Sequence, residues 1–160
     1  PFFMCLFLPA QDPTDPPPKW YTTLQVDPSN TPVIDGKLNG VVWATVPWTS
    51  DFVDVSLDEN TPPSVQTKFK IIYSEKYLYI ALRALDPAPE TISARLSKHD
   101  GLDGDRISVL IDSYHDLRTA FLFTVSTAGV RGDEVIADNR NFESSWNPIW
   151  STKTVVDEKG

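Results

Sequence analysis

Apolar and polar residues alternate in the middle of the chain, first in VQTKFKIIY (residues 65–73). A period of two is typical of a β-strand with one buried face. The next stretch, YLYIALRAL (77–85), follows a short polar turn, so the two stretches are predicted to pair as a hairpin. The predicted apolar face of the first strand holds Val65, Thr67, Phe69, Ile71 and Tyr73, and its polar face holds Gln66, Lys68 and Lys70.

A second group of strands is predicted in the following half of the chain. ISVLID (107–112) reaches a polar turn, TAFLFTVS (119–126) returns, VRGDEVI (130–136) follows another turn, and STKTVVD (151–157) is predicted as a last strand. The best candidate for a helix, ETISARLSK (90–98), is weakened by β-branched residues near its start. About seven short strands without a convincing helix predict an all-β fold, an antiparallel β-sandwich or jelly roll.

The two ends of the chain differ from this pattern. PFFMCLFLPA is an apolar run too short to span a bilayer as a helix, and residues 1–11 are interpreted as the remnant of a signal peptide. A buried N-terminal strand is the alternative. DPTDPPPK (12–19) is predicted to be a stiff, proline-rich linker. The folded domain is therefore predicted to cover residues 20–160, with one or more C-terminal strands missing because the sequence ends at a predicted turn.

The stretch VIDGKLNGVVW (33–43) fits neither a regular helix nor a regular strand. Gly36 permits a positive φ, and the Asp35 side chain can accept hydrogen bonds from nearby backbone. Val42 and Trp43 then fold back onto the sheet edge, so Trp43 is predicted to plug an open end of the core. Asp35, Gly36 and Trp43 are therefore predicted to be structural residues, and a ligand contact by Trp43 is the alternative.

This bend also carries a family resemblance. The order IDG, a short polar turn and then Trp resembles the start of the family 9 carbohydrate-binding modules (CBM9). The resemblance continues with YLYIALRALD (77–86), DRISVLID (105–112) and SWNPIW (145–150), and it covers residues 30–160. The sequence is most similar to the DUF5916 branch, in which a CBM9-like β-sandwich forms the N-terminal domain of a larger protein. The sequence departs from the pattern at STAG (126–129), where Asn-Pro is expected before the glycine.

Aromatic side chains are the first candidates for ligand binding. A flat ring covers the apolar C–H face of a pyranose, and polar groups at the rim fix its hydroxyls. Trp146 and Trp150, on either side of Pro148, are the predicted carbohydrate-binding residues, and the resemblance implies a binding tryptophan nearby. Arg118 and Arg140 are predicted to hydrogen-bond sugar hydroxyls from loops. The alternatives are that the indoles pack as core and that the arginines are solvated surface.

The acidic loop HDGLDGD (99–105) is the candidate metal site. Asp100, Asp103 and Asp105 offer oxygen ligands of the kind that Ca²⁺ prefers, although the loop lacks the EF-hand spacing. The resemblance implies a structural calcium. In the alternative, the loop only forms a turn and Asp105 pairs with a nearby arginine. Further carboxylates that are predicted to cap turns or to join a metal shell are Asp112, Asp116 and Asp133.

Other chemistry is poorly represented in the sequence. Cys5 is the single cysteine, so an internal disulfide and a cysteine zinc site are excluded. The two histidines, His99 and His115, would need carboxylates to complete a zinc site, and none is predicted. There is no GxSxG motif, and nothing singles out two of the 22 acidic residues for glycoside hydrolysis. This domain itself is therefore predicted to be non-catalytic, while a hydrolase elsewhere in the parent protein stays open.

Charge and composition narrow the class of partner. The 160 residues include 22 acidic and 14 basic side chains, giving a net charge of −8, which argues against nucleic acid as a partner. We expect an exported protein, periplasmic, outer-membrane-associated or extracellular, whose module holds a polysaccharide or oligosaccharide near a larger parent chain. The alternatives are a structural domain that docks on the C-terminal region of its own parent chain, and an accessory domain of a glycoside hydrolase.

Overall fold

The structure of the protein, a computed structural model, describes residues 19–50, 52, 62–138 and 140–160. The predicted signal-peptide remnant and almost all of the predicted linker lie outside these residues. Within the described ranges, no helix is long and apolar enough to cross a membrane.

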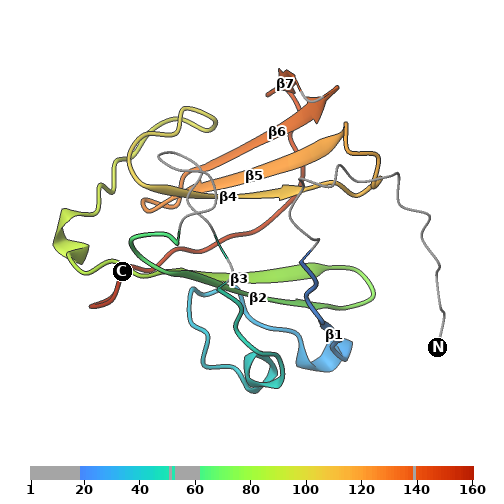
Figure 1. Ribbon diagram of the computed structural model, residues 1–160, viewed down its shortest axis with the longest axis vertical. Helices are drawn as coiled ribbons and strands as arrows, with labels where there is room; N and C mark the ends of the chain where they lie inside the picture. The colour runs from blue at the N-terminus through green and yellow to red at the C-terminus, as the bar shows by residue number, and fades with distance from the viewer. Residues whose placement is uncertain (1–18, 51, 53–61, 139) are drawn as a thin grey trace.

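The described residues contain seven β-strands in two sheets, which lie one above the other in Figure 1. The three-stranded sheet has the order β1-β2-β3, in which β1 runs parallel to β2 and the other pair is antiparallel. The four-stranded sheet, β4-β5-β6-β7, is antiparallel throughout. This arrangement confirms the predicted all-β fold and is consistent with a β-sandwich. The strands are β1 (Leu24–Gln25), β2 (Thr67–Tyr73), β3 (Leu78–Ala84), β4 (Arg106–Ile111), β5 (Ala120–Ser126), β6 (Arg131–Ala137) and β7 (Asn141–Glu143).

The predicted hairpins form in the expected places. β2 and β3 pair over their whole length, and the Ser74 side chain accepts a hydrogen bond from the backbone N–H of Tyr77 to close the turn. β4, β5 and β6 form a meander. The candidate helix is absent from the described residues, where the only helices are the short 3-10 helices η1 (Pro28–Asn30), η2 (Val41–Thr45) and η3 (Pro89–Thr91). A single turn of 3-10 helix is all that the β-branched start of that stretch supports.

The burial of β2 differs from its sequence pattern. Lys70, on the predicted polar face, is buried at 8% exposure, whereas Tyr73, on the predicted apolar face, is 38% exposed. Two contacts explain the buried charge, because the Lys70 ammonium donates to the backbone carbonyl of Trp43 at 2.6 Å and lies 5.0 Å from the centre of the Trp48 ring. Both faces of β2 are covered in its middle, so a simple in–out alternation does not describe this strand.

The most deeply buried cluster lies between the three-stranded sheet and the bend before it. Trp43, at 5% exposure in η2, packs with Ile72 of β2 and Ala81 of β3. Figure 1 draws η2 below the three-stranded sheet, on the side away from the four-stranded sheet. Trp43 therefore covers a sheet face, whereas the sequence analysis predicted a plug at an open end of the core. The local chemistry of the bend is as expected, since Gly36 has φ 79° and Asp35 accepts from the backbone N–H of Lys37 at 2.8 Å.

The C-terminal segment is not the predicted strand. Residues 151–157 carry no strand assignment, and in Figure 1 the segment after β7 runs through the space between the two sheets. Its contacts go to the ends of both sheets: Thr154 donates to the carbonyl of Thr127 at 3.1 Å, and the Arg83 guanidinium binds the carboxylate of Asp157 at 2.6 Å. These contacts link the segment to both sheets through side chains.

Candidate functional site

A row of five aromatic rings runs along one face of the four-stranded sheet. Neighbouring ring centres lie 6.0 Å apart for Tyr114 and Phe121, 4.9 Å for Phe121 and Trp146, 5.5 Å for Trp146 and Phe123, and 5.4 Å for Phe123 and Trp150. These separations and the tilted or edge-on orientations are those that aromatic pairs prefer. The row begins in solvent, where Tyr114 is 68% exposed, and ends at the half-buried Trp150.

The strand pattern explains why the row forms. Phe121 and Phe123 are two residues apart on β5, so both side chains leave the same face of the sheet. The irregular segment after β7 crosses this face and lays Trp146 and Trp150 on the two phenylalanines. The two tryptophans were predicted from the sequence and the phenylalanines were not, because alternation on a strand is expected for any core residue.

The predicted arginines lie at the exposed end of the row. Arg118 immediately precedes β5 and forms an ion pair with Asp138 in the β6–β7 turn, while the exposed Arg140 belongs to the same turn. Backbone N–H groups of Thr119 and Arg118 donate to Asp116, and these hydrogen bonds hold the pKa of its carboxyl below the ordinary value. The two arginines therefore lie in the turns at the end of the sheet where β5 begins and β6 ends, and hydrogen bonds to Asp116 fix the backbone around Arg118.

Trp150 has a different environment from Trp146. Its indole N–H donates to Asp133 at 2.8 Å, its carbonyl accepts from the Arg131 guanidinium at 2.7 Å, and that guanidinium lies 5.8 Å from the ring centre. These contacts occupy the polar atom of the indole and cover part of its surface. Trp150 remains a candidate for sugar stacking only through the part of the ring that Phe123 and Arg131 leave uncovered.

Two hollows among the described residues are lined by neither of the two tryptophans. One lies among Asp100, Leu102, Arg106, Gly132 and Glu134, and the other lies along the bend at residues 30–43. Of the five rings of the row, only Tyr114 is exposed, and the other four are half-buried.

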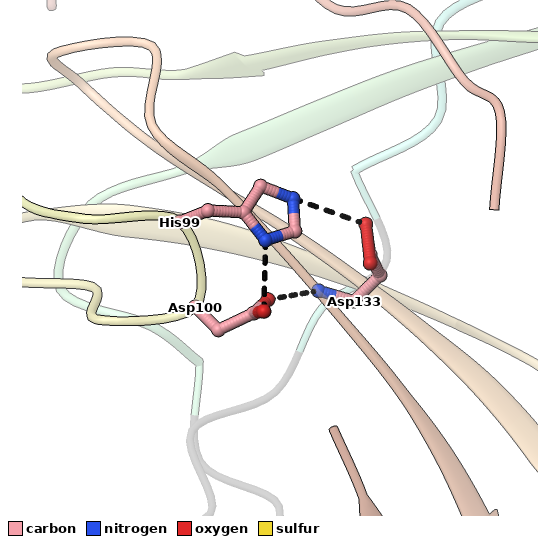
Figure 2. A group of neighbouring side chains, drawn as sticks. All are labelled: His99, Asp100 and Asp133. Atoms are coloured by element: carbon pink, nitrogen blue, oxygen red, sulfur yellow. Dashed lines mark hydrogen bonds and ion pairs between the residues drawn. The ribbon is translucent and has the colours of Figure 1, made fainter. Parts of the chain in front are cut away.

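A second group of polar side chains lies beside Trp150. His99, Asp100 and Asp133 place their potential ligand atoms within 4.8 Å of one another, as Figure 2 shows. His99 Nδ1 lies 2.8 Å from Asp100 Oδ2, and His99 Nε2 lies 3.7 Å from Asp133 Oδ1. Asp100 Oδ1 accepts from the backbone N–H of Asp133 at 3.1 Å, which joins the loop to β6. Asp133 is 1% exposed, and its Oδ2 has no hydrogen-bond partner among the described residues.

The three aspartates predicted to hold calcium do not meet at one point. Asp103 accepts from the backbone N–H of Gly104 at 2.9 Å, and Asp105 accepts from the backbone N–H of Ser93 at 2.7 Å. Gly104 has φ 81°, and a Cβ atom there would lie 2.3 Å from the carbonyl oxygen of Ser93. Asp103 and Asp105 thus act in the turn, as in the alternative reading, and Asp100 alone joins the cluster. The described residues do not fit the predicted calcium cage, and calcium binding stays a prediction.

Of the remaining predicted carboxylates, one caps a turn and another lies in the cluster with His99. Asp112 accepts from the backbone N–H of Leu117 at 2.8 Å and caps the turn between β4 and β5. Asp133, which was predicted either to cap a turn or to join a metal shell, lies in the cluster with His99. The closeness of His99 to Asp133 was not predicted, because Asp133 lies on a strand that is distant in the sequence.

Comparison of the chain with family models, with curated proteins and with solved structures found no match.

Proposed function

We propose that the protein is a non-catalytic carbohydrate-binding module of an exported protein. The module holds a polysaccharide or oligosaccharide through the aromatic row of the four-stranded sheet. Trp146 is the main stacking surface, and Tyr114 extends it into solvent. Arg118 and Arg140 supply hydrogen-bond donors at the rim.

The observation that carries this proposal is the combination of rings and arginines at one end of the sheet. Tyr114 is 68% exposed, Trp146 is half-buried against Phe121, and Arg118 is ion-paired to an exposed aspartate beside them. A ring held by other rings loses little conformational entropy when a sugar stacks on it, and guanidinium groups donate in a fixed fork.

A glycan array, followed by affinity electrophoresis in polysaccharide gels with and without EDTA, tests the proposal. We expect retardation in at least one polysaccharide and a change of tryptophan fluorescence with the corresponding oligosaccharide. Loss of retardation in EDTA would connect binding to a metal. Release of reducing sugars by the purified chain would contradict the non-catalytic role, and the absence of binding to every glycan tested would contradict the module itself.

A second candidate is a docking domain that packs against the C-terminal region of its own parent chain. The outer face of the four-stranded sheet favours it, because Leu110 of β4 and Phe142 of β7 are 58% and 60% exposed there. Side chains of this size are usually covered when they lie on a protein interface. In a longer protein that contains this domain, docking predicts that both residues become protected from covalent surface labelling. Equal labelling in the short and long chains would exclude this candidate.

A further inference from the structure

The carboxylate of Asp133 is buried and only half satisfied. Trp150 donates its indole N–H to Oδ1 at 2.8 Å, whereas Oδ2 has no hydrogen-bond partner among the described residues, although the residue is 1% exposed. Removing an ionised carboxylate from water costs several kcal/mol unless a positive group or a full set of donors replaces the water. The free Oδ2 is therefore a buried acceptor that a cation or a further donor can fill.

His99 presents a nitrogen to the same carboxylate. Its Nδ1 lies 2.8 Å from Asp100 Oδ2, a distance at which Nδ1–H donates to the carboxylate. In the neutral ring this leaves a lone pair on Nε2, which faces Asp133 Oδ1 at 3.7 Å (Figure 2). That separation is too long for a hydrogen bond. It is close to the spacing of about 3.4 Å between two ligands that share one tetrahedral zinc ion at bond lengths of about 2.1 Å.

The backbone holds these groups in place. Asp100, with φ 61°, donates its N–H to the carbonyl of Arg131 at 3.1 Å, and its Oδ1 accepts from the N–H of Asp133. Gly132 lies between them on β6, and a Cβ atom there would lie 2.7 Å from the Leu102 side chain. The acidic loop is thus fixed against the edge of the sheet at the point where His99 and Asp133 meet.

We propose that His99 Nε2 and the Asp133 carboxylate bind a divalent transition-metal ion of the zinc class. Asp100 orients the imidazole through Nδ1, and the Trp150 indole orients the Asp133 carboxylate, so that each ligand has an outer hydrogen-bonding partner. An imidazole ligand selects zinc-like ions over calcium, which prefers a shell of oxygens. His99 is 40% exposed, so the ion has an entry path and water completes its coordination. This site adjoins the proposed sugar surface at Trp150, but metal binding here does not require that a sugar binds.

Isothermal titration of the full chain with ZnCl₂ at pH 7.5 tests the site, with CaCl₂ as a parallel titration. All proteins carry Cys5→Ser, so that the single thiol does not contribute to binding. We expect one zinc ion per chain, and a change in tryptophan emission because the Trp150 indole is bonded to a ligand of the metal. His99→Ala is expected to weaken zinc binding at least tenfold, and Asp133→Asn to do the same.

His115→Ala is the matched control, since His115 is the other histidine and is exposed in a turn. It is expected to leave zinc affinity unchanged. Asp133→Asn risks misfolding because the residue is buried. If it misfolds, His99→Ala, at an exposed residue, decides the test. Absence of zinc binding, equal loss in His115→Ala, or tighter binding of calcium than of zinc would overturn the proposal.

Discussion

At the scale of single residues, Asp133 and Trp150 connect the two candidate sites. The Trp150 ring closes the aromatic row against Phe123, and its N–H is the one hydrogen bond to the Asp133 side chain among the described residues. A substitution of either residue is therefore expected to alter both the aromatic row and the cluster around His99. Loss of this contact is costly, because a buried carboxylate that loses its only donor keeps its full desolvation penalty.

Trp150→Phe is expected to lower the free energy of unfolding by about 1–3 kcal/mol, because Asp133 then has no donor for either oxygen. The ring contact with Phe123 is largely kept in this variant. Urea denaturation measures the change, and Trp146→Phe is the matched control, in which no side-chain hydrogen bond among the described residues is removed. Equal stability of the two variants would mean that the indole bond to Asp133 contributes nothing.

Trp43→Ala is expected to lower the free energy of unfolding by about 3–5 kcal/mol, the usual cost of truncating a buried tryptophan. Trp43 is 5% exposed in the most deeply buried cluster. The control is Trp20→Ala, since Trp20 is 82% exposed and a surface change usually stays within about 0.5 kcal/mol. An unchanged melting temperature for Trp43→Ala would contradict the structural role of this indole.

At the scale of elements, the bend and the C-terminal segment support each other without forming a strand pair. Gly36 lies against Val155, and Asp157 binds Arg83 on β3. Contacts of this kind come from turns and single side chains, so they depend on backbone conformation and on charge more than on sheet hydrogen bonds.

Gly36→Ala is expected to destabilise the protein by about 1–2 kcal/mol from backbone conformation alone, because residue 36 has φ 79°. The added Cβ would also lie 2.5 Å from Val155 Cγ2, so the segment must shift. Gly40→Ala serves as the control, with negative φ and no contact closer than 3.7 Å. Thermal denaturation compares the two, and equal melting temperatures would show that the bend tolerates a side chain at both positions.

Asp157 gives the C-terminal contact a pH dependence. The backbone N–H of Lys159 and then the Arg83 guanidinium hold the pKa of Asp157 below its ordinary value of 3.8. A lowered pKa in the folded state contributes stability above the ordinary pKa, and this contribution is lost as the pH falls through the folded-state pKa. The melting temperature of Asp157→Asn is therefore expected to lie below that of the wild type at pH 7 and to approach it below pH 3.8.

The control for this pH series is Glu158→Gln, which changes the neighbouring exposed charge. It is expected to follow the wild type across the whole range. A difference between wild type and Asp157→Asn that stayed constant down to pH 2 would show that the carboxylate acts through packing and not through its charge.

At the scale of the whole molecule, much of the fold was predictable because local pattern and local turns determine it. The hairpin of β2 and β3 and the meander of β4, β5 and β6 follow from alternation between polar turns. The short strands β1 and β7 were not predictable, since two or three residues carry no period. The burial of Lys70 depends on a carbonyl at Trp43, which no pattern within β2 reveals.

The candidate sites were predictable only in part, for a related reason. Trp146 and Trp150 stand out in the sequence because they lie in an irregular segment, where large rings have no strand pattern to explain them. The meeting of His99 with Asp133 depends on how the acidic loop is hydrogen-bonded to β6, which is a long-range contact. Of the three aspartates predicted as metal ligands, only Asp100 lies in the cluster with His99, whereas Asp103 and Asp105 accept backbone hydrogen bonds in the turn.

Calorimetric titration with the glycan that binds best on the array is the most direct test of the central claim, that the aromatic row is a sugar-binding surface. Trp146→Ala is compared with Phe142→Ala, which removes an aromatic ring that is 60% exposed on the other face of the sheet. We expect Trp146→Ala to weaken glycan binding at least tenfold while the protein stays folded. We expect Phe142→Ala to bind the glycan as the wild type does. Unchanged affinity in Trp146→Ala, or equal loss in both variants, would contradict the central claim.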